Sequence, residues 1–283
     1  MAKYVLSAFA DEVTNVFEDQ LKYLNKQGIK YIEPRNIDGT NVSSLTIEQA
    51  KNAKALMDKY GIKAYSLGSP IGKYDITKDQ TDHWNQFLHT LELAEIFGAK
   101  CIRMFSYFYP EGEDVHKYRD EIFANLEKLV AEAEKKGIVL CHENEARIYG
   151  EAVEDCADLM KHFDGKLRSV LDMGNFAFCH QDPYKGYEAV KDYIEYIHIK
   201  DAFDDGKIVV AGNGEGRIED ILRDYDKCTD KEVILTLEPH LTVFDGLKNL
   251  SNMDDIKVQE AYATPEIAFD AAVEALRAIL ARI

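Results

Sequence analysis

Four residues whose side chains bind metal ions stand at the ends of four consecutive strand-like runs. They are Glu143 in IVLCHE, Asp172 in RSVLD, His198 in YIHIKD and Glu238 in VILTLE. Side chains alternate along a strand, so we expect the last inward residue of each run to point to the axis of a closed sheet. Three carboxylates and one imidazole gathered there would repel one another without a cation. The pattern therefore predicts a site for one divalent metal ion.

The donor set also indicates which metals fit. Oxygen-rich ligation with a single nitrogen suits Mn²⁺, Mg²⁺ or Co²⁺ and leaves Zn²⁺ open. Taken singly, each of the four residues could equally be a helix N-cap or a surface charge. Their occurrence together on consecutive strands favours the metal site.

The elements that must position these residues follow a repeating pattern of helix end, glycine and strand. It recurs as KQGIKYIE, KYGIKAYSL, IFGAKCIRMF and KKGIVLCHE, with Gly28, Gly61, Gly98 and Gly137 at the point where a helix ends. Each unit is a helix that leads into a strand, and such strands pair in parallel through right-handed crossovers. Eight units of about 35 residues account for the chain, which predicts an α/β fold, a (β/α)8 TIM barrel, as a single domain over residues 1–283.

We expect strands and helices to alternate along the whole chain. The predicted strands are 4–9, 29–33, 62–67, 99–105, 138–143, 168–172, 194–200 and 232–238. The predicted helices are 16–27, 46–60, 79–97, 116–136, 151–163, 183–192, 218–228 and 264–282. The irregular stretches 201–217 and 239–263 follow strands, so they should lie on the C-terminal face of the barrel, where active sites of this fold occur.

Composition excludes some partners. The net charge of −17 opposes binding to nucleic acid or to an anionic membrane, and it otherwise favours simple solubility. The first apolar run ends at Asp11 and is too short for a signal peptide or a membrane span. Five cysteines without a CxxC pair fit a reduced cytoplasmic location, with Cys101 and Cys141 as small buried hydrophobes. A homo-oligomer is left open.

Basic residues near the strand ends are candidates for substrate binding. Lys200 lies two residues past the histidine, on the same face, and could hold a hydroxyl, an oxyanion or a phosphate, or could pair with an acid such as Asp172. Arg103 ends the fourth predicted strand and Arg35 follows the second, and either could clamp substrate or form a buried ion pair. Glu33 is a candidate partner for one of these arginines.

Other candidates come from the loops. Glu145 could orient a ligand or a substrate hydroxyl, with a solvated loop charge as the alternative. His240 is placed similarly after the eighth strand, and Lys73 in GSPIGK could reach substrate from the loop after the third. An apolar wall for a sugar could come from Phe9, Tyr107 and Phe108.

These motifs together resemble the xylose-isomerase-like TIM-barrel superfamily of sugar phosphate isomerases and epimerases. Ketose 3-epimerases, inosose dehydratases and endonuclease IV share that superfamily. The resemblance covers essentially the whole chain and rests on HENE at 142–145, LDMGN at 171–175, IHIKD at 197–201 and LEPH at 237–240. Weaker matches are YIEPR at 31–35, GSPIGK at 68–73 and GNGEGR at 212–217.

The resemblance implies roles for the four strand-end residues. Glu143, Asp172, His198 and Glu238 would bind the catalytic metal, and the two glutamates would lie near opposite faces of a bound sugar. One glutamate would remove a proton from the carbon next to a metal-chelated carbonyl. The other would return a proton to the opposite face in an epimerase, whereas an isomerase would return it to the adjacent carbon.

The rival functions are a lyase of the inosose-dehydratase kind, a DNA-repair nuclease and a sugar-binding barrel without turnover. The trinuclear zinc cluster of endonuclease IV needs histidines where this chain has YIEPR, SLGS and GNGEG. Asn175 stands where several relatives have histidine. The leading interpretation is a metal-dependent isomerase or epimerase of a small-molecule sugar, sugar phosphate or polyol-derived ketone. Because no short glycine-rich phosphate grip precedes a helix after the eighth strand, we favour a substrate without phosphate among these.

Overall fold

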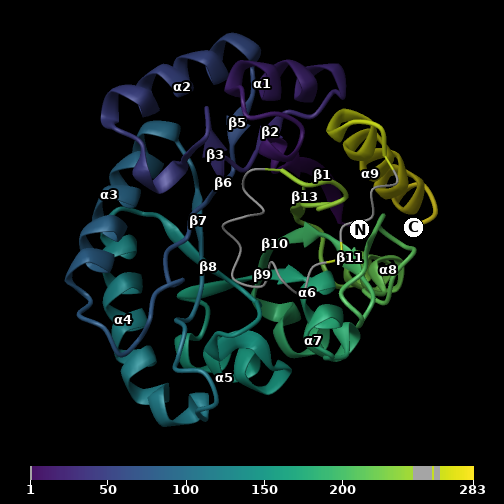
Figure 1. Cartoon of the computed structure of the whole chain (residues 1–283). Coiled ribbons are helices and arrows are strands. Elements are labelled where there is room, and N and C mark those ends of the chain that lie inside the picture. Colours follow the sequence, from purple (N-terminus) through teal and green to yellow (C-terminus); the bar gives the residue numbers. More distant parts are fainter. Residues whose placement is uncertain (1, 245–256, 258–261) are drawn as a thin grey trace.

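The structure is a computed structural model that describes residues 2–244, 257 and 262–283. Parallel strands form the wall of a barrel, and helices surround it on the outside (Figure 1). In chain order the wall consists of β1 Lys3–Ala8, β2 Tyr31–Ile32, β5 Lys63–Ala64 with β6 Ser66–Gly68, β7 Cys101–Met104, β8 Val139–Glu143, β9 Leu167–Asp172, β10 Ile194–Ile199 and β13 Glu232–Leu237.

The wall closes on itself. Seven strands pair in the order β1-β13-β10-β9-β8-β7-β6, and β2 pairs in parallel with β5. The remaining gap is bridged by two backbone hydrogen bonds: the Glu33 N–H donates to the Ala8 carbonyl at 3.1 Å, and the Gly68 N–H donates to the Pro34 carbonyl at 2.9 Å. The predicted α/β fold, a (β/α)8 TIM barrel, is confirmed.

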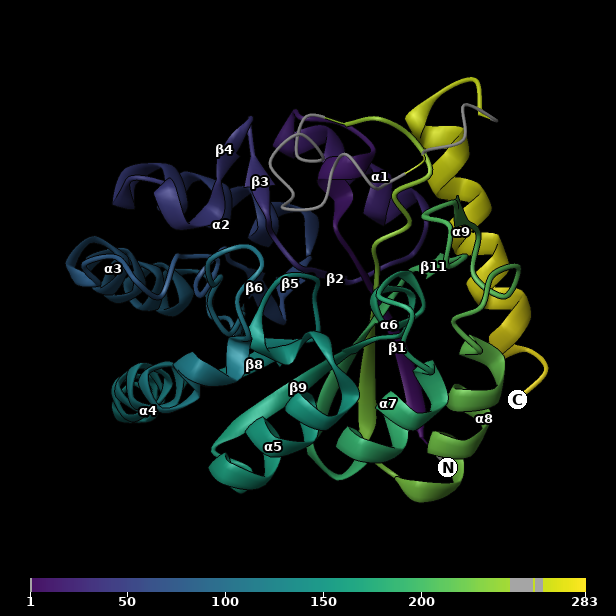
Figure 2. The ribbon, with the colours of Figure 1, turned by 60° about the horizontal axis from the view of Figure 1, so that its bottom comes forward.

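Eight helices of the described chain cover the wall. They are α1 Phe17–Lys26, α2 Ile47–Tyr60, α3 Thr81–Phe97, α4 Arg119–Lys135, α5 Val153–Phe163, α7 Pro183–Val190, α8 Ile218–Cys228 and α9 Pro265–Leu280. Seen from the side, α9 stands beside α8 (Figure 2), and the ion pair of Arg282 with Glu219 at 2.6 Å ties its end to that helix. No described helix is long and apolar enough to cross a membrane.

The predicted strands and helices agree with the structure except in the region of β2, β5 and β6. The predicted strand 29–33 is reduced to Tyr31–Ile32, because Pro34 follows closely and has no N–H to extend the ladder. The predicted strand 62–67 is interrupted at Tyr65. This side of the barrel is therefore made of short pieces.

Several short elements lie outside the predicted set. A short helix, α6 Met173–Phe178, follows β9. The hairpins are β3 Asn36–Ile37 with β4 Thr40–Asn41, and β11 Asp201–Ala202 with β12 Ile208–Val209. The 3₁₀ turns are Ala10–Glu12, Val42–Ser44, Val115–Tyr118, Tyr149–Glu151 and Lys191–Tyr193. Most of the predicted irregular stretch 239–263 lies outside the described residues.

A layer of buried side chains lies in the barrel interior, below the candidate site. The layer consists of Cys101, Cys141, Val170, Tyr196 and Ile234. Side chains of a strand alternate between its two faces, so residues two or four positions further along point to the same axis. This layer places Arg103, Glu143, Asp172, His198 and Glu238 at the top of the barrel. Both of its cysteines are buried and unbridged, as predicted.

Candidate active site

The four strand-end residues meet at the C-terminal end of the barrel. One ligand atom from each of Glu143, Asp172, His198 and Glu238 lies within 4.8 Å of the others, and all four side chains are buried. Nδ1 of His198 is 3.0 Å from Glu143 Oε1 and 3.2 Å from Glu238 Oε2. The strand ends thus bring together three carboxylates and one imidazole.

The two glutamates are each held by a buried arginine. Nη1 of Arg103 donates to Glu143 Oε2 at 3.0 Å, and Nη1 of Arg35 donates to Glu238 Oε1 at 2.9 Å. Each arginine therefore occupies one carboxylate oxygen and leaves the other directed at the histidine. Of the two sequence interpretations of Arg35 and Arg103, the buried ion pair is present for both.

Asp172 and His198 are held in the same way. Oδ1 of Asp172 accepts the Asn175 N–H at 2.8 Å as the N-cap of α6, and Nζ of Lys200 forms an ion pair with Asp172 Oδ2 at 2.9 Å. Nε2 of His198 lies 3.1 Å from Glu33 Oε2. The expected pairing of Glu33 with an arginine is wrong: Arg35 is taken by other acids, and Glu33 reaches across the barrel to the imidazole.

The arrangement leaves acceptor atoms that suit a cation. Oδ2 of Asp172 and Oε2 of Glu238 are buried and receive no hydrogen bond from the described residues; only ion pairs reach them. Buried acceptors without a donor are costly, so such atoms favour a bound ion or water beside them. The donor set of three carboxylates and one imidazole fits a divalent metal ion.

The acids of the cluster differ in their electrostatics. Burial alone would raise the pKa of Glu143, but His198 and Arg103 hold that pKa at about 2. Burial raises the pKa of Asp172 to about 7 in spite of the neighbouring Lys200. A carboxylate that burial disfavours in its charged form gains most from an added positive charge. The cluster therefore favours binding of a cation.

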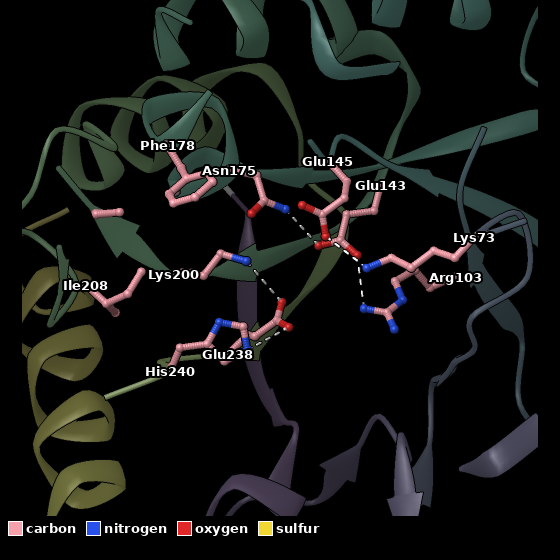
Figure 3. A pocket seen from close by; sticks show the side chains of 12 residues that line it. Lys73, Arg103, Glu143, Glu145, Asn175, Phe178, Lys200, Ile208, Glu238 and His240 are labelled. Atoms are coloured by element: carbon pink, nitrogen blue, oxygen red, sulfur yellow. Dashed lines mark hydrogen bonds and ion pairs between the residues drawn. The ribbon is translucent and has the colours of Figure 1, made fainter. Parts of the chain in front are cut away.

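A cavity of about 20 Å³ lies beside the cluster. Its lining is Lys73, Arg103, Glu143, Glu145, Gly174, Asn175, Phe178, Lys200, Ala202, Ile208, Glu238 and His240. In Figure 3, Lys200 and His240 approach Glu238 from one side, and Arg103 approaches Glu143 from the other. A volume of this size accommodates a water molecule. A sugar ring needs the lining side chains to move apart.

Lys73 and Glu145 form an ion pair at the cavity wall. Nζ of Lys73 is 3.1 Å from Glu145 Oε2 and lies 4.4 Å from the centre of the Phe105 ring. Glu145 is only 6% exposed. The alternative interpretation of Glu145 as a solvated loop charge is therefore wrong.

His240 lines the cavity, and its ring stacks on Phe244. Its Nε2 lies 3.3 Å from Glu238 Oε1 and 3.4 Å from Glu12 Oε1, while Nδ1 has no hydrogen-bond partner among the described residues. Burial lowers the pKa of His240 to about 4, so the ring is neutral at pH 7. Glu12, Glu238 and His240 form a second group close enough to hold an ion. Arg35 contacts both of those carboxylates and already supplies the positive charge there.

The expected apolar wall is different in the structure. None of Phe9, Tyr107 and Phe108 is among the residues that line the cavity. Phe9 packs edge-on against His198 at 5.1 Å and carries the Arg35 guanidinium over its face. Phe9 therefore supports the ligands from behind. Apolar lining comes from Phe178, Ala202 and Ile208 instead.

Sequence reasoning missed the acids that hold Arg35 and the aromatic residue of α6. Asp11 and Glu12 contact Arg35 at 3.0 and 3.2 Å, and their position directly after the first strand was a usable signal. Phe178 lies in a short helix without a helical repeat long enough to detect. In the sequence, Asn175 stands out only because several relatives have histidine at that position. In the structure its side chain donates to the Asn144 carbonyl and to Glu143 Oε1.

Comparisons with solved structures show the same fold over the whole chain. D-allulose 3-epimerase from Methylomonas sp., solved with D-allulose, superposes with a TM-score of 0.73 at 16% identity and covers 100% of this chain and 98% of its own. A probable 3-DHS dehydratase from Bacillus anthracis superposes with a TM-score of 0.71 at 13% identity, and the match covers 98% of this chain and 99% of the dehydratase. A xylose isomerase-like TIM barrel protein from Mycobacterium smegmatis, solved in complex with magnesium, superposes with a TM-score of 0.70 at 14% identity. The match covers 98% of this chain and 96% of that protein.

Comparison of the sequence with known protein families identifies one family. No curated protein matches the sequence. Residues 21–226 match the family described as xylose isomerase-like TIM barrel. This segment holds six of the eight strand positions together with Glu143, Asp172 and His198, while β1, β13 and Glu238 lie outside it. The chain therefore belongs to the xylose isomerase-like TIM barrel family.

Proposed function

We propose that this protein is a metal-dependent isomerase or epimerase of a sugar or polyol-derived ketone. The observation that carries the proposal is the buried cluster of Glu143, Asp172, His198 and Glu238, in which two carboxylate oxygens receive no hydrogen bond from the part of the chain that the structure describes. One divalent ion, Mn²⁺, Mg²⁺, Co²⁺ or Zn²⁺, suits this donor set. Two of the structural neighbours are sugar epimerases, and they support the proposal only by analogy of fold.

The chemistry follows from the two glutamates. A bound divalent ion would polarise a substrate carbonyl and so acidify the neighbouring C–H. Glu143 and Glu238 are both held ionised, because the pKa of each is lowered by the basic residues around it in spite of burial. One glutamate removes the proton, and the other returns a proton to the opposite face of the same carbon or to the adjacent carbon.

Other residues of the cavity wall would position the substrate. His240 offers its Nδ1, which has no hydrogen-bond partner among the described residues, to a substrate hydroxyl. Lys73 and Glu145, which pair with each other, can exchange that pairing for hydroxyl groups. Arg103 and Lys200 contact ligands of the cluster and would steady both the acids and the developing negative charge of the substrate.

The charge balance favours a substrate without phosphate. Lys73, Arg103 and Lys200 are the basic residues that line the cavity, and each already pairs with an acid. A phosphate dianion would have to draw one of these cations away from its carboxylate. A neutral ketose needs only hydrogen bonds.

Proton exchange tests the proposal. Metal-loaded protein is incubated in D₂O with a panel of ketoses and inososes, and deuterium uptake is followed by NMR. Uptake at the carbon next to the carbonyl is expected, and Glu143→Gln and Glu238→Gln should abolish it. Glu195→Gln is the matched control, since Glu195 pairs with Tyr65 and Lys100, away from the cavity lining. Exchange into none of the compounds contradicts the proposal.

The same experiment separates the second candidate, a dehydratase. A dehydratase stands among the structural neighbours, and elimination begins with the same removal of a proton beside a carbonyl. A dehydratase would convert an inosose into a product that lacks one water, whereas an epimerase or isomerase conserves the mass. A sugar-binding barrel without turnover would give neither exchange nor mass change.

A further inference from the structure

Glu33 is a buried carboxylate that does not line the cavity. It directly follows β2, and its backbone N–H is fixed to β1 through the Ala8 carbonyl at 3.1 Å. Glu33 is only 1% exposed to solvent. An ionised carboxylate in such a place is expensive unless it is well bonded, so its partners indicate what it does.

The partner of Glu33 is the ring of His198. Nδ1 of His198 faces Glu143 Oε1 at 3.0 Å and Glu238 Oε2 at 3.2 Å, and Nε2 faces Glu33 Oε2 at 3.1 Å. A neutral imidazole carries a single N–H. A nitrogen that binds a metal must present its lone pair, so a ligand at Nδ1 requires the proton on Nε2. Glu33 is the acceptor for that proton.

Glu33 is itself prevented from turning. The Tyr196 hydroxyl donates to Glu33 Oε1 at 2.7 Å and lies 2.9 Å from Ser66 Oγ. Tyr196 belongs to the interior layer of the barrel, two residues before His198 on β10, and the two rings pack edge to face at 5.4 Å. The Phe9 ring confines His198 as well, at 5.1 Å. The carboxylate and the imidazole are therefore both locked.

We infer that Glu33 is a positioning residue that selects the Nε2–H tautomer of His198 and so makes Nδ1 the metal-binding nitrogen. This inference rests on the metal site of the proposed function, but not on which substrate is turned over. A purely structural Glu33 would need no particular nitrogen of the histidine. Removing the partner of a metal-binding histidine typically weakens metal affinity about 10- to 100-fold.

The test is metal binding by the full-length protein. Mn²⁺ is titrated into chelator-treated wild type, Glu33→Gln and Glu195→Gln, with calorimetry as the readout and thermal unfolding of each metal-free protein as a fold control. Glu195 lies on β10, three residues before His198, and pairs with Tyr65 and Lys100 away from the cluster. We expect Glu33→Gln to raise the Kd for Mn²⁺ about 10- to 100-fold and Glu195→Gln to leave it unchanged. A Kd for Glu33→Gln within twofold of wild type overturns the inference.

A second measurement needs no variant. Long-range ¹H–¹⁵N spectra of the wild-type protein loaded with Zn²⁺ report which nitrogen of His198 carries the proton. A protonated Nε2 with a metal-shifted Nδ1 supports the inference, and the reverse assignment overturns it, even if Glu33→Gln does not fold. Metal binding by wild type without sugar turnover contradicts only the proposed function. Failure of wild type to bind Mn²⁺ or Zn²⁺ overturns both.

Discussion

The two halves of the barrel wall are built differently. Strands β8, β9, β10 and β13 contain five or six residues each and carry or lead directly into the four candidate ligands. Across the barrel, β2 and β5 have two residues each and β6 has three. This second half contributes Glu33, Arg35 and Lys73, which contact acids or the imidazole of the site.

The difference separates two tasks. Regular strands fix where a side chain points, because each ligand follows an interior residue at a spacing of two or four. Short, interrupted strands carry longer side chains that reach across the barrel. Arg35 contacts Glu238 Oε1 in this way, and Glu33 contacts His198 Nε2. Sites built on strands are more precise than sites built on loops. We call the side with β8, β9, β10 and β13 the ligand half, and the side with β2, β5 and β6 the bracing half. We therefore expect substitutions in the ligand half to abolish catalysis, and substitutions in the bracing half to alter stability or affinity.

The largest effect is expected for Glu238→Gln in the ligand half. The amide keeps the shape of the side chain but cannot accept a proton, and loss of a general base costs about 10²- to 10⁴-fold in rate. Deuterium exchange with metal-loaded protein measures this loss. A barrel of this size has its own core, so thermal unfolding should remain cooperative.

The control for Glu238→Gln is Glu195→Gln, which should leave both exchange and unfolding close to wild type. If Glu238→Gln is unfolded at room temperature, Glu238 is structural and its assignment as a base is wrong. If it is folded and exchanges deuterium at the wild-type rate, the two glutamates do not share the proton transfer.

In the bracing half, Arg35→Met should chiefly lower stability. Its guanidinium contacts Asp11, Glu12 and Glu238, all buried, and stacks on Phe9. Removing one partner of a buried ion pair costs about 3–5 kcal/mol because the remaining charges stay buried. Urea unfolding measures the change, with Arg168→Met, a partly exposed arginine of β9, as the control. A loss below about 1 kcal/mol would show that the acids are protonated or solvated without Arg35.

The same contrast explains what could be predicted from the sequence. Alternation along regular strands was enough to bring Glu143, Asp172, His198 and Glu238 to one point. It could not predict that Glu33 pairs with His198, since that contact spans 165 positions of the chain and depends on how the barrel closes. Phe9 was misplaced for the same reason. Phe178 belongs to a six-residue helix, too short for periodicity to be read.

Metal removal tests whether the cluster itself binds an ion. Elemental analysis of protein purified without chelator should find close to one divalent ion per chain. Chelation should leave the barrel folded, and Mn²⁺ at about 100 times its Kd should add about 2.7 kcal/mol to the free energy of unfolding. Three zinc ions per chain, or no binding after reconstitution with Mn²⁺, contradicts the single-ion site.

The smallest effect is expected for the lysines, one from each half. Lys200→Met leaves Asp172 and Glu238 without the ammonium that lies 2.9 and 3.7 Å from them. We expect kcat on a free sugar to fall about tenfold with KM unchanged, because a hydrogen bond to a charged group contributes about 1.5–3 kcal/mol. Lys73→Met removes the ion pair with Glu145 and the contact of the ammonium with the Phe105 ring, and it should raise KM about fivefold, as expected for interactions that contribute about 1 kcal/mol.

Paired free and phosphorylated sugars decide what these two lysines recognise. If the substrate is neutral, each variant changes the kinetics of both sugars by the same factor, since neither lysine contacts a phosphate. A selective rise in KM for the phosphorylated sugar in Lys200→Met would place the phosphate in the ligand half, beside Asp172. The same selective rise in Lys73→Met would place it in the bracing half, beside Glu145. Either selective result contradicts the assignment of an unphosphorylated substrate, and the two results locate the phosphate on different sides of the cavity.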